Sequence, residues 1–264
     1  GGAEEGAVPA GGQGSAQDGC VMVLSVCPGL DLLGMAFEME GFTVVRGGDP
    51  LFGQLGIEGF HPPPRVFEGV IGGPPCGPWA KTRNLAKGKE KQPNLIPEFE
   101  RVVAEAQPRW FLMENVTGAP IPKVKGYQTQ SLVIYAWELG SPQRRPRRFT
   151  FGSNPPVLLL WPHGEKPPRG VLTLTAKKDL QPGQRKVLPT MPATNTTLRM
   201  RCGERVRIRG KTCFTLDDYL EGFGLPPDWD AEVCLKVAKF KLLGNSVPLQ
   251  VGRPLARAIK GALG

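Results

Sequence analysis

Short strand-like segments alternate with stretches of helical periodicity along the first half of this chain. Residues 21–26 (VMVLSV) form a continuous apolar run, which is typical of a parallel strand buried on both faces. Apolar residues from Leu32 to Met39 then recur at helical spacing, and Gly41 follows as a helix stop. Strands that alternate with helices predict an α/β fold, with a doubly wound, mostly parallel, Rossmann-like sheet.

The same periodicities locate the remaining elements. They predict further strands at 42–45, 67–71 (FEGVI) and 110–113 (WFLM), and helices at 94–106, 216–223 and 248–263. The pattern decays after about residue 151, where the chain is rich in Pro, Thr, Lys and Arg. Two strand-like pieces, at 157–161 and 171–175, indicate a small β-rich region there.

These patterns divide the chain into four parts. The Gly-rich residues 1–19 are expected to form a flexible tail. A first domain covers 20–152 and the small β-rich region covers 153–211. The last part, 212–264, returns to the first domain.

Positive charge is concentrated in one segment of the sequence. The whole chain of 264 residues has a formal net charge of +9. Residues 141–211 carry 16 Lys or Arg and 3 Asp or Glu, whereas the rest carries 17 basic and 21 acidic residues. A basic segment on a near-neutral body favours binding to a polyanion such as nucleic acid, because cations that neutralise phosphates release counterions. A merely solvated basic loop is the alternative.

The cysteines and the hydropathy exclude several classes of protein. Six cysteines contain no C-x-x-C pair and two histidines lie far from any cysteine pair, so we expect neither a metal site nor a disulfide framework. No apolar stretch is long enough to span a membrane, and residues 1–19 do not resemble a signal peptide. We therefore expect an intracellular protein that does not bind membranes.

Unusual segments follow three of the predicted strands. They are 27–31 (CPGLD), 72–78 (GGPPCGP) and 114–116 (ENV). Ligands of open α/β sheets bind beyond the carboxyl ends of the strands, so Cys76 and Glu114 are expected to lie close together there. A thiol and a proton-holding carboxyl suit covalent attack on an electron-poor ring. Taken singly, a cysteine in a turn is more often structural, and a glutamate at a strand end is often solvated.

Four ordered motifs make the chain resemble the cytosine-5 DNA methyltransferase family, over residues 21–263. Its catalytic loop resembles GGPPC at 72–76, and its Glu-Asn-Val motif resembles MENV at 113–116. Its Gln-x-Arg-x-Arg motif resembles QRRPR at 143–147, and its closing motif resembles GNSVP at 244–248. The resemblance implies a target-recognition role for the β-rich region, and small solitary phage or bacterial members are the most similar in organisation.

The resemblance also implies a reaction and the residues that catalyse it. A cytosine flips out of duplex DNA, and the Cys76 thiolate adds to carbon 6 of its ring. Glu114 protonates N3, and Arg145 steadies the carbonyl oxygen with help from Arg147. Carbon 5 then takes a methyl group from S-adenosylmethionine, which leaves S-adenosylhomocysteine. The partner is duplex DNA, and no metal is required. The resemblance further implies a monomer that acts in restriction and modification, in the cytoplasm of a bacterium or of a phage-infected cell.

Cofactor and DNA contacts are carried over position by position. The implied cofactor residues are Pro28, Gly29, Leu30, Asp49, Pro74, Asn245 and Val247. The implied DNA-binding residues are Gln143, Arg144, Lys177, Lys178, Arg199, Arg201 and Arg207. Asp49 precedes Pro50, so an ordinary turn aspartate is an equal alternative to a ribose ligand.

The sequence departs from the family at several positions. Cys27 and Asp31 stand at the places of an aromatic residue and a second glycine in the first motif, and Gly56 stands at the place of an aspartate, with Glu58 nearby. Gly77 and Ala80 alter the catalytic loop. Two other functions therefore stay open: an RNA cytosine-5 methyltransferase, and a DNA-binding relative that has lost catalysis.

Overall fold

The computed structural model describes residues 21–50, 53–75, 79, 93–164, 172–173, 185–186, 216–229 and 242–264. A six-stranded sheet in the order β2-β1-β3-β4-β6-β5 forms its centre. Its strands are β1 (Met22–Val26), β2 (Thr43–Gly47), β3 (Gly69–Gly72), β4 (Trp110–Asn115), β5 (Gln128–Tyr135) and β6 (Pro146–Ser153). Strands β1 to β4 are parallel, and β6 is antiparallel to both β4 and β5. The carboxyl ends of β1 to β5 therefore meet the start of β6 at one edge.

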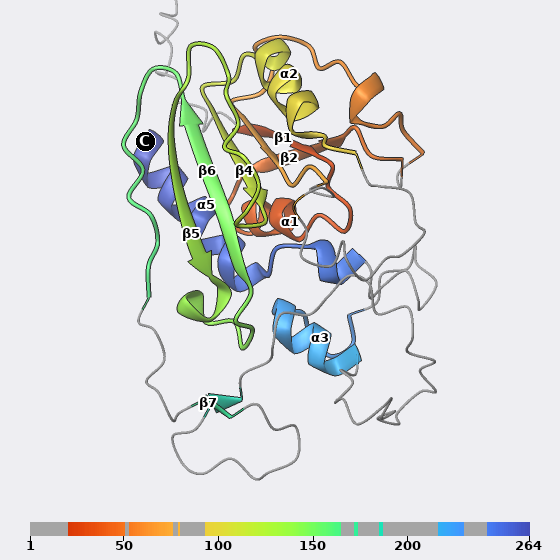
Figure 1. Cartoon of the computed structure of the whole chain (residues 1–264), viewed down its shortest axis with the longest axis vertical. Helices are drawn as coiled ribbons and strands as arrows, with labels where there is room; N and C mark the ends of the chain where they lie inside the picture. Colours follow the sequence, from red (N-terminus) through yellow and green to blue (C-terminus); the bar gives the residue numbers. More distant parts are fainter. Residues whose placement is uncertain are drawn as a thin grey trace, which may run out of the picture.

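Helices cover both faces of the sheet (Figure 1). Helices α1 (Leu32–Glu38) and α5 (Leu249–Leu263) bury one apolar cluster with Trp110 and Phe151, whereas α2 (Ile96–Ala106) buries another with Phe111. Trp110 and Phe111 are neighbours on β4 and point to opposite faces, as side chains of successive strand residues do. The sheet is thus buried on both sides, as the continuous apolar runs predict.

Helix α3 (Leu216–Phe223) adds a third apolar cluster against α1. Tyr219 and Phe223 are fully buried there beside Leu32 and Ala36. This packing returns a late segment of the chain to the first domain, next to the loop that precedes β6. Two short 3-10 helices, η2 (Ile57–Gly59) and η5 (Ala136–Leu139), complete the described core, and β7 (Leu172–Thr173) pairs with β8 (Arg185–Lys186) in a separate two-stranded sheet.

The predicted fold class is confirmed, and most predicted elements appear within two residues of their bounds. Strands β5 and β6 were not expected from the sequence. The structure also corrects one predicted strand: residues 157–161 form no strand, because Gln130 bonds this segment through its side chain rather than through a backbone ladder. Its Nε2 donates to the Val157 carbonyl at 2.6 Å, and its Oε1 accepts from the Leu159 N–H at 3.2 Å. The expected tail at 1–19 lies outside the described residues.

Candidate active site

The first side of the site lies at the carboxyl ends of β1 and β2. The backbone N–H of Gly29, in the turn after β1, donates to Asp49 Oδ2 at 2.8 Å. Gly29 has a φ of +58°, a conformation that glycine adopts without strain, and a Cβ at this position would meet nothing within 4 Å. The bond places a carboxylate beside an open stretch of backbone. Pro28 and Leu30, the other expected residues of this turn, are half-buried.

Cys27 lies in the same turn, and its thiol is protonated at neutral pH. Burial, together with the negative charges of Asp49 and Glu58, raises the pKa of Cys27 to about 12. A thiol with such a pKa is a weak nucleophile. Cys27 is therefore not a candidate for covalent catalysis, and the electrostatic effect shows that both carboxylates face this turn.

Asp31 occupies the start of α1 and is held from several sides. Its Oδ1 accepts from Ser25 Oγ at 2.7 Å and from the Gly34 N–H at 3.0 Å, and Arg46 Nε lies 2.7 Å from its Oδ2. Burial nevertheless raises the pKa of Asp31 to about 6, against the opposing effect of these partners. The carboxyl caps the helix, so a residue that departs from the family pattern has a structural role.

The second side of the site lies where β3 and β4 end. Asn115 Nδ2 donates to the Pro74 carbonyl at 3.2 Å, which fastens the Gly-Pro loop after β3 to the end of β4. A Cβ on Gly73 would come within 3.1 Å of Glu114 Oε2, so the loop backbone lies against this carboxylate. Cys76, the expected nucleophile, follows Pro75 and lies outside the described residues, as do Gly77 and Ala80.

Glu114 pairs with an arginine from the neighbouring antiparallel strand. Arg147 Nε lies 2.8 Å from Glu114 Oε1, and both side chains are largely buried. The register explains the contact: Glu114 opposes Phe149, and Arg147 lies two residues before Phe149 on the same face of β6. A buried carboxylate with a charged hydrogen-bond donor faces the loop that ends at Pro75.

Arg145 has different surroundings from Arg147. Its side chain is 1% exposed, and its Nη2 donates to the carbonyls of Gly244 and Ser246, both at 2.8 Å. Its guanidinium also lies 5.2 Å from the centre of the Phe223 ring. Arg145 therefore joins the 143–147 segment to the 244–248 segment and to α3. These contacts explain why the two motifs, a hundred residues apart, adjoin in the fold.

Gln143 and Arg144, two of the expected DNA-binding residues, have different surroundings in the structure. Gln143 is fully buried, and its Nε2 donates to the Gly222 carbonyl of α3 at 2.6 Å. Arg144, the next residue, is exposed. Asn245 is exposed, whereas Val247 is 5% exposed and packs in the apolar cluster of α5. The other expected DNA-binding residues lie outside the described residues: Lys177, Lys178, Arg199, Arg201 and Arg207.

Two contributions were missed at the sequence level. Asn115 was noticed as part of a motif but not as the group that fastens the Pro74 loop. Tyr135 and Trp137 flank the start of η5 and stack on each other, with ring centres 5.7 Å apart. Two aromatic residues two positions apart, followed by a basic Gln-x-Arg-x-Arg segment, were the available signal.

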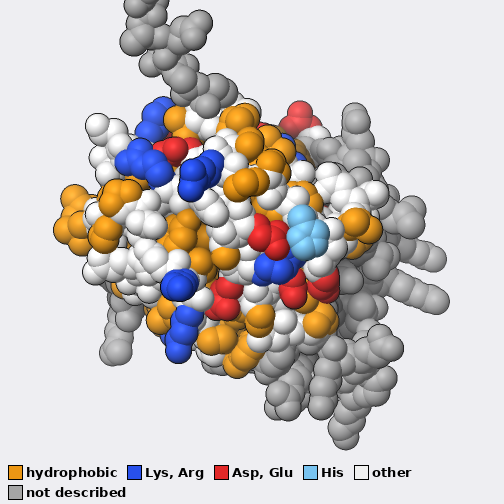
Figure 2. Space-filling view, turned by 90° about the horizontal axis from the view of Figure 1, so that it is seen from above, with side chains coloured by type: hydrophobic (Ala, Val, Ile, Leu, Met, Phe, Trp, Pro, Cys, Tyr) orange, Lys and Arg blue, Asp and Glu red, His pale blue; other side chains and the backbone are white. Residues whose placement is uncertain are grey.

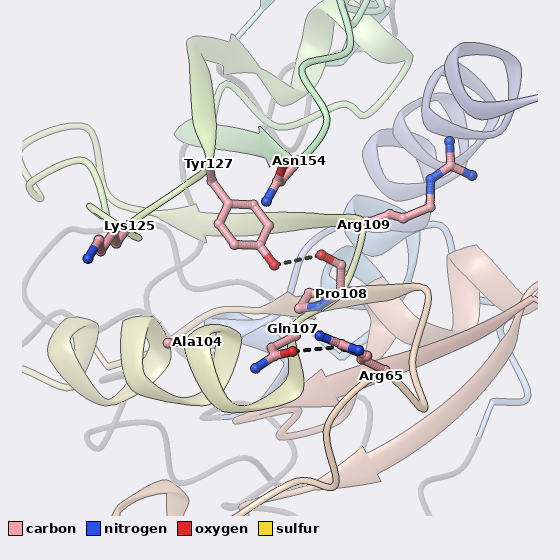
Figure 3. A pocket seen from close by; sticks show the side chains of 8 residues that line it. All are labelled: Arg65, Ala104, Gln107, Pro108, Arg109, Lys125, Tyr127 and Asn154. Carbon is pink, nitrogen blue, oxygen red and sulfur yellow. Dashed lines mark hydrogen bonds between the residues drawn. The ribbon is translucent and has the colours of Figure 1, made fainter.

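A cavity lies at the opposite side of the sheet, where β4 begins. Its volume is about 410 Å³, and its lining includes Arg65, Arg109, Lys125 and Tyr127. The basic groups do not converge on a common point, because Arg65 bonds Gln107 while Arg109 and Lys125 point outward (Figure 3). On the face above this edge, basic and acidic side chains are interspersed (Figure 2).

No group of three or more metal-ligating side chains occurs among the residues that the structure describes. Within the same residues, no helix has the length and hydropathy needed to cross a membrane.

Part of the sequence is similar to known methyltransferases. Residues 60–170 match the model of the C-5 cytosine-specific DNA methylase family. The type II methyltransferase M.HgiDI of Herpetosiphon aurantiacus is 34% identical over 93 residues, which span 31% of this chain and 30% of that protein. M.SacI of Streptomyces achromogenes is 37% identical over 100 residues, or 31% and 26% of the two chains. The chain thus matches less than a third of the length of these curated relatives.

Solved structures resemble the chain over most of its length. The Entamoeba histolytica methyltransferase EhMeth has a TM-score of 0.61 at 12% identity, and covers 92% of this chain and 99% of its own. A putative DNA modification methyltransferase encoded within an Escherichia coli prophage has a TM-score of 0.56 at 18% identity, with the same coverage. At such identities the likeness concerns the fold. Together these comparisons show a match to the C-5 cytosine-specific DNA methylase family over residues 60–170 and a methyltransferase-like fold over most of the chain.

Proposed function

We propose that the chain transfers a methyl group from S-adenosylmethionine to carbon 5 of a flipped-out cytosine in duplex DNA. The observation that carries the proposal is the buried Glu114–Arg147 pair, which lies against the loop that leads to Cys76. The match of residues 60–170 to the C-5 cytosine-specific DNA methylase model supports the reaction class and favours DNA over RNA, and the curated relatives are type II methyltransferases.

The cofactor fits the open turn after β1. A carboxylate held beside an exposed backbone suits a ligand that carries hydroxyl groups and positive charge, and Asp49 with Gly29 supplies that combination. Glu58, whose charge also acts on this turn, would contribute at its other side. Bound there, S-adenosylmethionine would supply the methyl group. Cys27 would stay neutral and would not compete for alkylation.

The protein side chains divide the covalent chemistry among them. The Cys76 thiolate would form a bond to carbon 6, and the ring electrons displaced by this bond would enrich carbon 5. Glu114 would donate a proton to N3, so that negative charge does not accumulate on the ring. After methylation, loss of the carbon-5 proton to water and return of the N3 proton to Glu114 would expel the thiolate from carbon 6. These steps would restore the aromatic ring, the Cys76 thiolate and the protonated Glu114.

Arg147, rather than Arg145, is the arginine that we assign to the cytosine. Arg147 forms an ion pair with Glu114, whereas Nη2 of Arg145 donates to two backbone carbonyls. The order of roles expected from the sequence is therefore reversed. Arg145 would act by holding the 244–248 segment in place.

The remaining proposals concern partners and setting. Residues 20–152 and 212–264 would form the catalytic unit, and the basic residues 153–211 would recognise the DNA target. The chain would act as a monomer, inside a bacterium or a phage-infected cell. A restriction-modification role fits the type II relatives.

A labelled methyl group tests the proposal. The protein is incubated with methyl-labelled S-adenosylmethionine and mixed-sequence duplex DNA, beside Cys76→Ser, with transfer RNA as competitor. We expect label in 5-methylcytosine of the DNA, none with Cys76→Ser, and no competition by the RNA. Label in the RNA would move the substrate to RNA. DNA binding without any transfer would instead favour a relative that has lost catalysis.

A further inference from the structure

Arg144 is the exposed residue of an otherwise buried segment. Gln143 before it is 0% exposed, and Arg145 after it is 1% exposed. Both neighbours are bonded to other elements, through the carbonyls of Gly222, Gly244 and Ser246. The backbone of Arg144 is therefore fixed from both sides, and its side chain projects from a rigid base.

Two aromatic rings hold the Arg144 side chain. Its Cζ atom lies 5.8 Å from the centre of the Tyr135 ring and 5.6 Å from that of Trp137. The rings are stacked on each other at an interplanar angle of 21°. A guanidinium over an aromatic face is attracted by the ring quadrupole and keeps its N–H donors available at its edge.

The stack lies on the side of the molecule that carries the candidate active site. Tyr135 opposes Pro146 at the end of β5, next to the Ile134–Arg147 pair, so its side chain leaves the sheet on the face opposite to Arg147, which contacts Glu114. Figure 1 shows that β5 ends, and η5 follows, at the edge where β4 also ends. Among the described residues, no carboxylate forms an ion pair with Arg144. Within that part of the chain its positive charge has no ion-pair partner, and it lies at the end of the sheet that carries the candidate active site.

We propose that Tyr135 and Trp137 are positioning residues that hold Arg144 as a contact to a backbone phosphate of the DNA. The proposal rests on the function proposed above. A guanidinium that is ordered before binding loses less side-chain freedom when it meets the phosphate than a free lysine or arginine does. The stack therefore strengthens one contact without adding a charge.

Salt dependence separates the charge of Arg144 from its positioning. The full chain is titrated against a fluorescent duplex oligonucleotide at several salt concentrations. Loss of one phosphate contact in Arg144→Ala should lower the slope of log affinity against log salt by about 0.9, and affinity at low salt by about fivefold. Tyr135→Leu and Trp137→Leu should each weaken binding about two- to threefold with the slope unchanged, because the charge remains.

A matched variant and a double variant complete the experiment. Lys125→Ala removes one exposed charge at the other edge of the sheet and should leave the slope at the wild-type value. In the Arg144→Ala background, Trp137→Leu should cause no further loss, because the ring acts through the arginine. Tyr135→Leu provides the same test if Trp137→Leu does not fold, and thermal melting identifies that case.

The outcomes distinguish the two proposals. Equal slopes for Arg144→Ala and Lys125→Ala would overturn the phosphate contact, and additive losses in the double variant would overturn the positioning role. Either result leaves the proposed function intact as long as the wild-type chain transfers methyl groups to DNA. A wild-type chain that neither binds nor methylates duplex DNA would overturn both.

Discussion

The two ends of the strands in the central sheet differ in how their polar groups are arranged. The carboxyl edge is the side of the sheet where β1 to β5 end, and the amino edge is the side where they begin. At the carboxyl edge, polar side chains are buried and bonded to one another across elements: Asp49 to Gly29, Asn115 to Pro74, and Arg147 to Glu114. At the amino edge, the 410 Å³ cavity is bordered by cations that point apart. Its Tyr127 hydroxyl donates to the Pro108 carbonyl at 2.6 Å and so supports the loop.

The difference shows that cavity size alone does not locate this site. Convergent polar groups with fixed geometry can act on a ligand, whereas scattered surface charges mainly serve solubility. Parallel strands explain the asymmetry, because their carboxyl ends bring loops from distant parts of the sequence to one place. Matched substitutions at the two edges should therefore have different effects.

The largest difference is expected for two glutamates. Glu114→Gln should reduce methyl transfer about 10²- to 10⁴-fold, because an amide cannot donate the proton that N3 requires. Glu68→Gln, which removes the partner of Arg109 at the amino edge, should retain wild-type activity. Initial rates of label incorporation measure both. Equal losses in the two variants would remove the distinction between the edges.

Arg145 and Arg147 should separate stability from catalysis. Arg145→Met leaves two buried carbonyls without a donor and should lower the free energy of unfolding by about 3 kcal/mol. Arg147→Lys keeps a positive charge beside the buried Glu114 and should change this free energy by about 1 kcal/mol or less, while loss of the planar guanidinium lowers activity about 100-fold. Urea unfolding and transfer rates give the two quantities. If Arg145→Met is stable but inactive, Arg145 rather than Arg147 is the arginine that contacts the cytosine.

Asp31 should give the carboxyl edge a pH-dependent stability. Its pKa is about 6 in the folded chain, against 3.8 for an unperturbed aspartate, so the folded state holds the proton more tightly. This contribution to stability is therefore present at pH 3.5 and is lost as the pH rises through about 6, by on the order of 2 kcal/mol. Asp31→Asn should remove this fall. The free energy of unfolding is measured from pH 3.5 to 7.5 for both proteins. If the variant shows the same fall in stability, another titrating group is responsible for it.

A smaller effect is expected for cofactor binding. Asp49→Asn should weaken S-adenosylhomocysteine about tenfold, because a carboxylate accepts hydrogen bonds from ribose hydroxyls more strongly than an amide does. Asn154→Ala, a comparable change on the lining of the amino-edge cavity, should leave the affinity unchanged. Calorimetric titration measures both constants. Unchanged binding in Asp49→Asn would make it the ordinary turn aspartate that the sequence also allowed.

The fold was predictable where one physical pattern dominates. Buried parallel strands such as β1 and β4 are continuous apolar runs, and α3 and α5 have clear helical spacing. Strand β5 was not predicted because it is the last strand of the sheet and its first four residues, QTQS, are polar and mostly exposed, so it has no continuous apolar run. Residues 157–161 misled because their apolar content is high while Pro155 and Pro162 flank them.

The candidate site was predictable to the level of motifs but not of individual roles. The ends of parallel strands correctly grouped Glu114 with the loop after β3. The motif could not tell Arg145 from Arg147, because their roles depend on which neighbours the start of β6 meets: Gly244 and Ser246 for one, Glu114 for the other. Burial of Gln143 likewise depends on α3, which lies about 80 positions later in the chain.

The most direct test of the account is to trap the covalent step and map it. Duplex DNA in which cytosine carries fluorine at carbon 5 cannot lose a proton there, so the bond between sulfur and carbon 6 should persist after methylation. We predict a stable protein–DNA adduct whose peptide map assigns the linkage to Cys76, at the carboxyl edge. An adduct on a different cysteine, or methyl transfer without any adduct, would contradict the assignment of the active site.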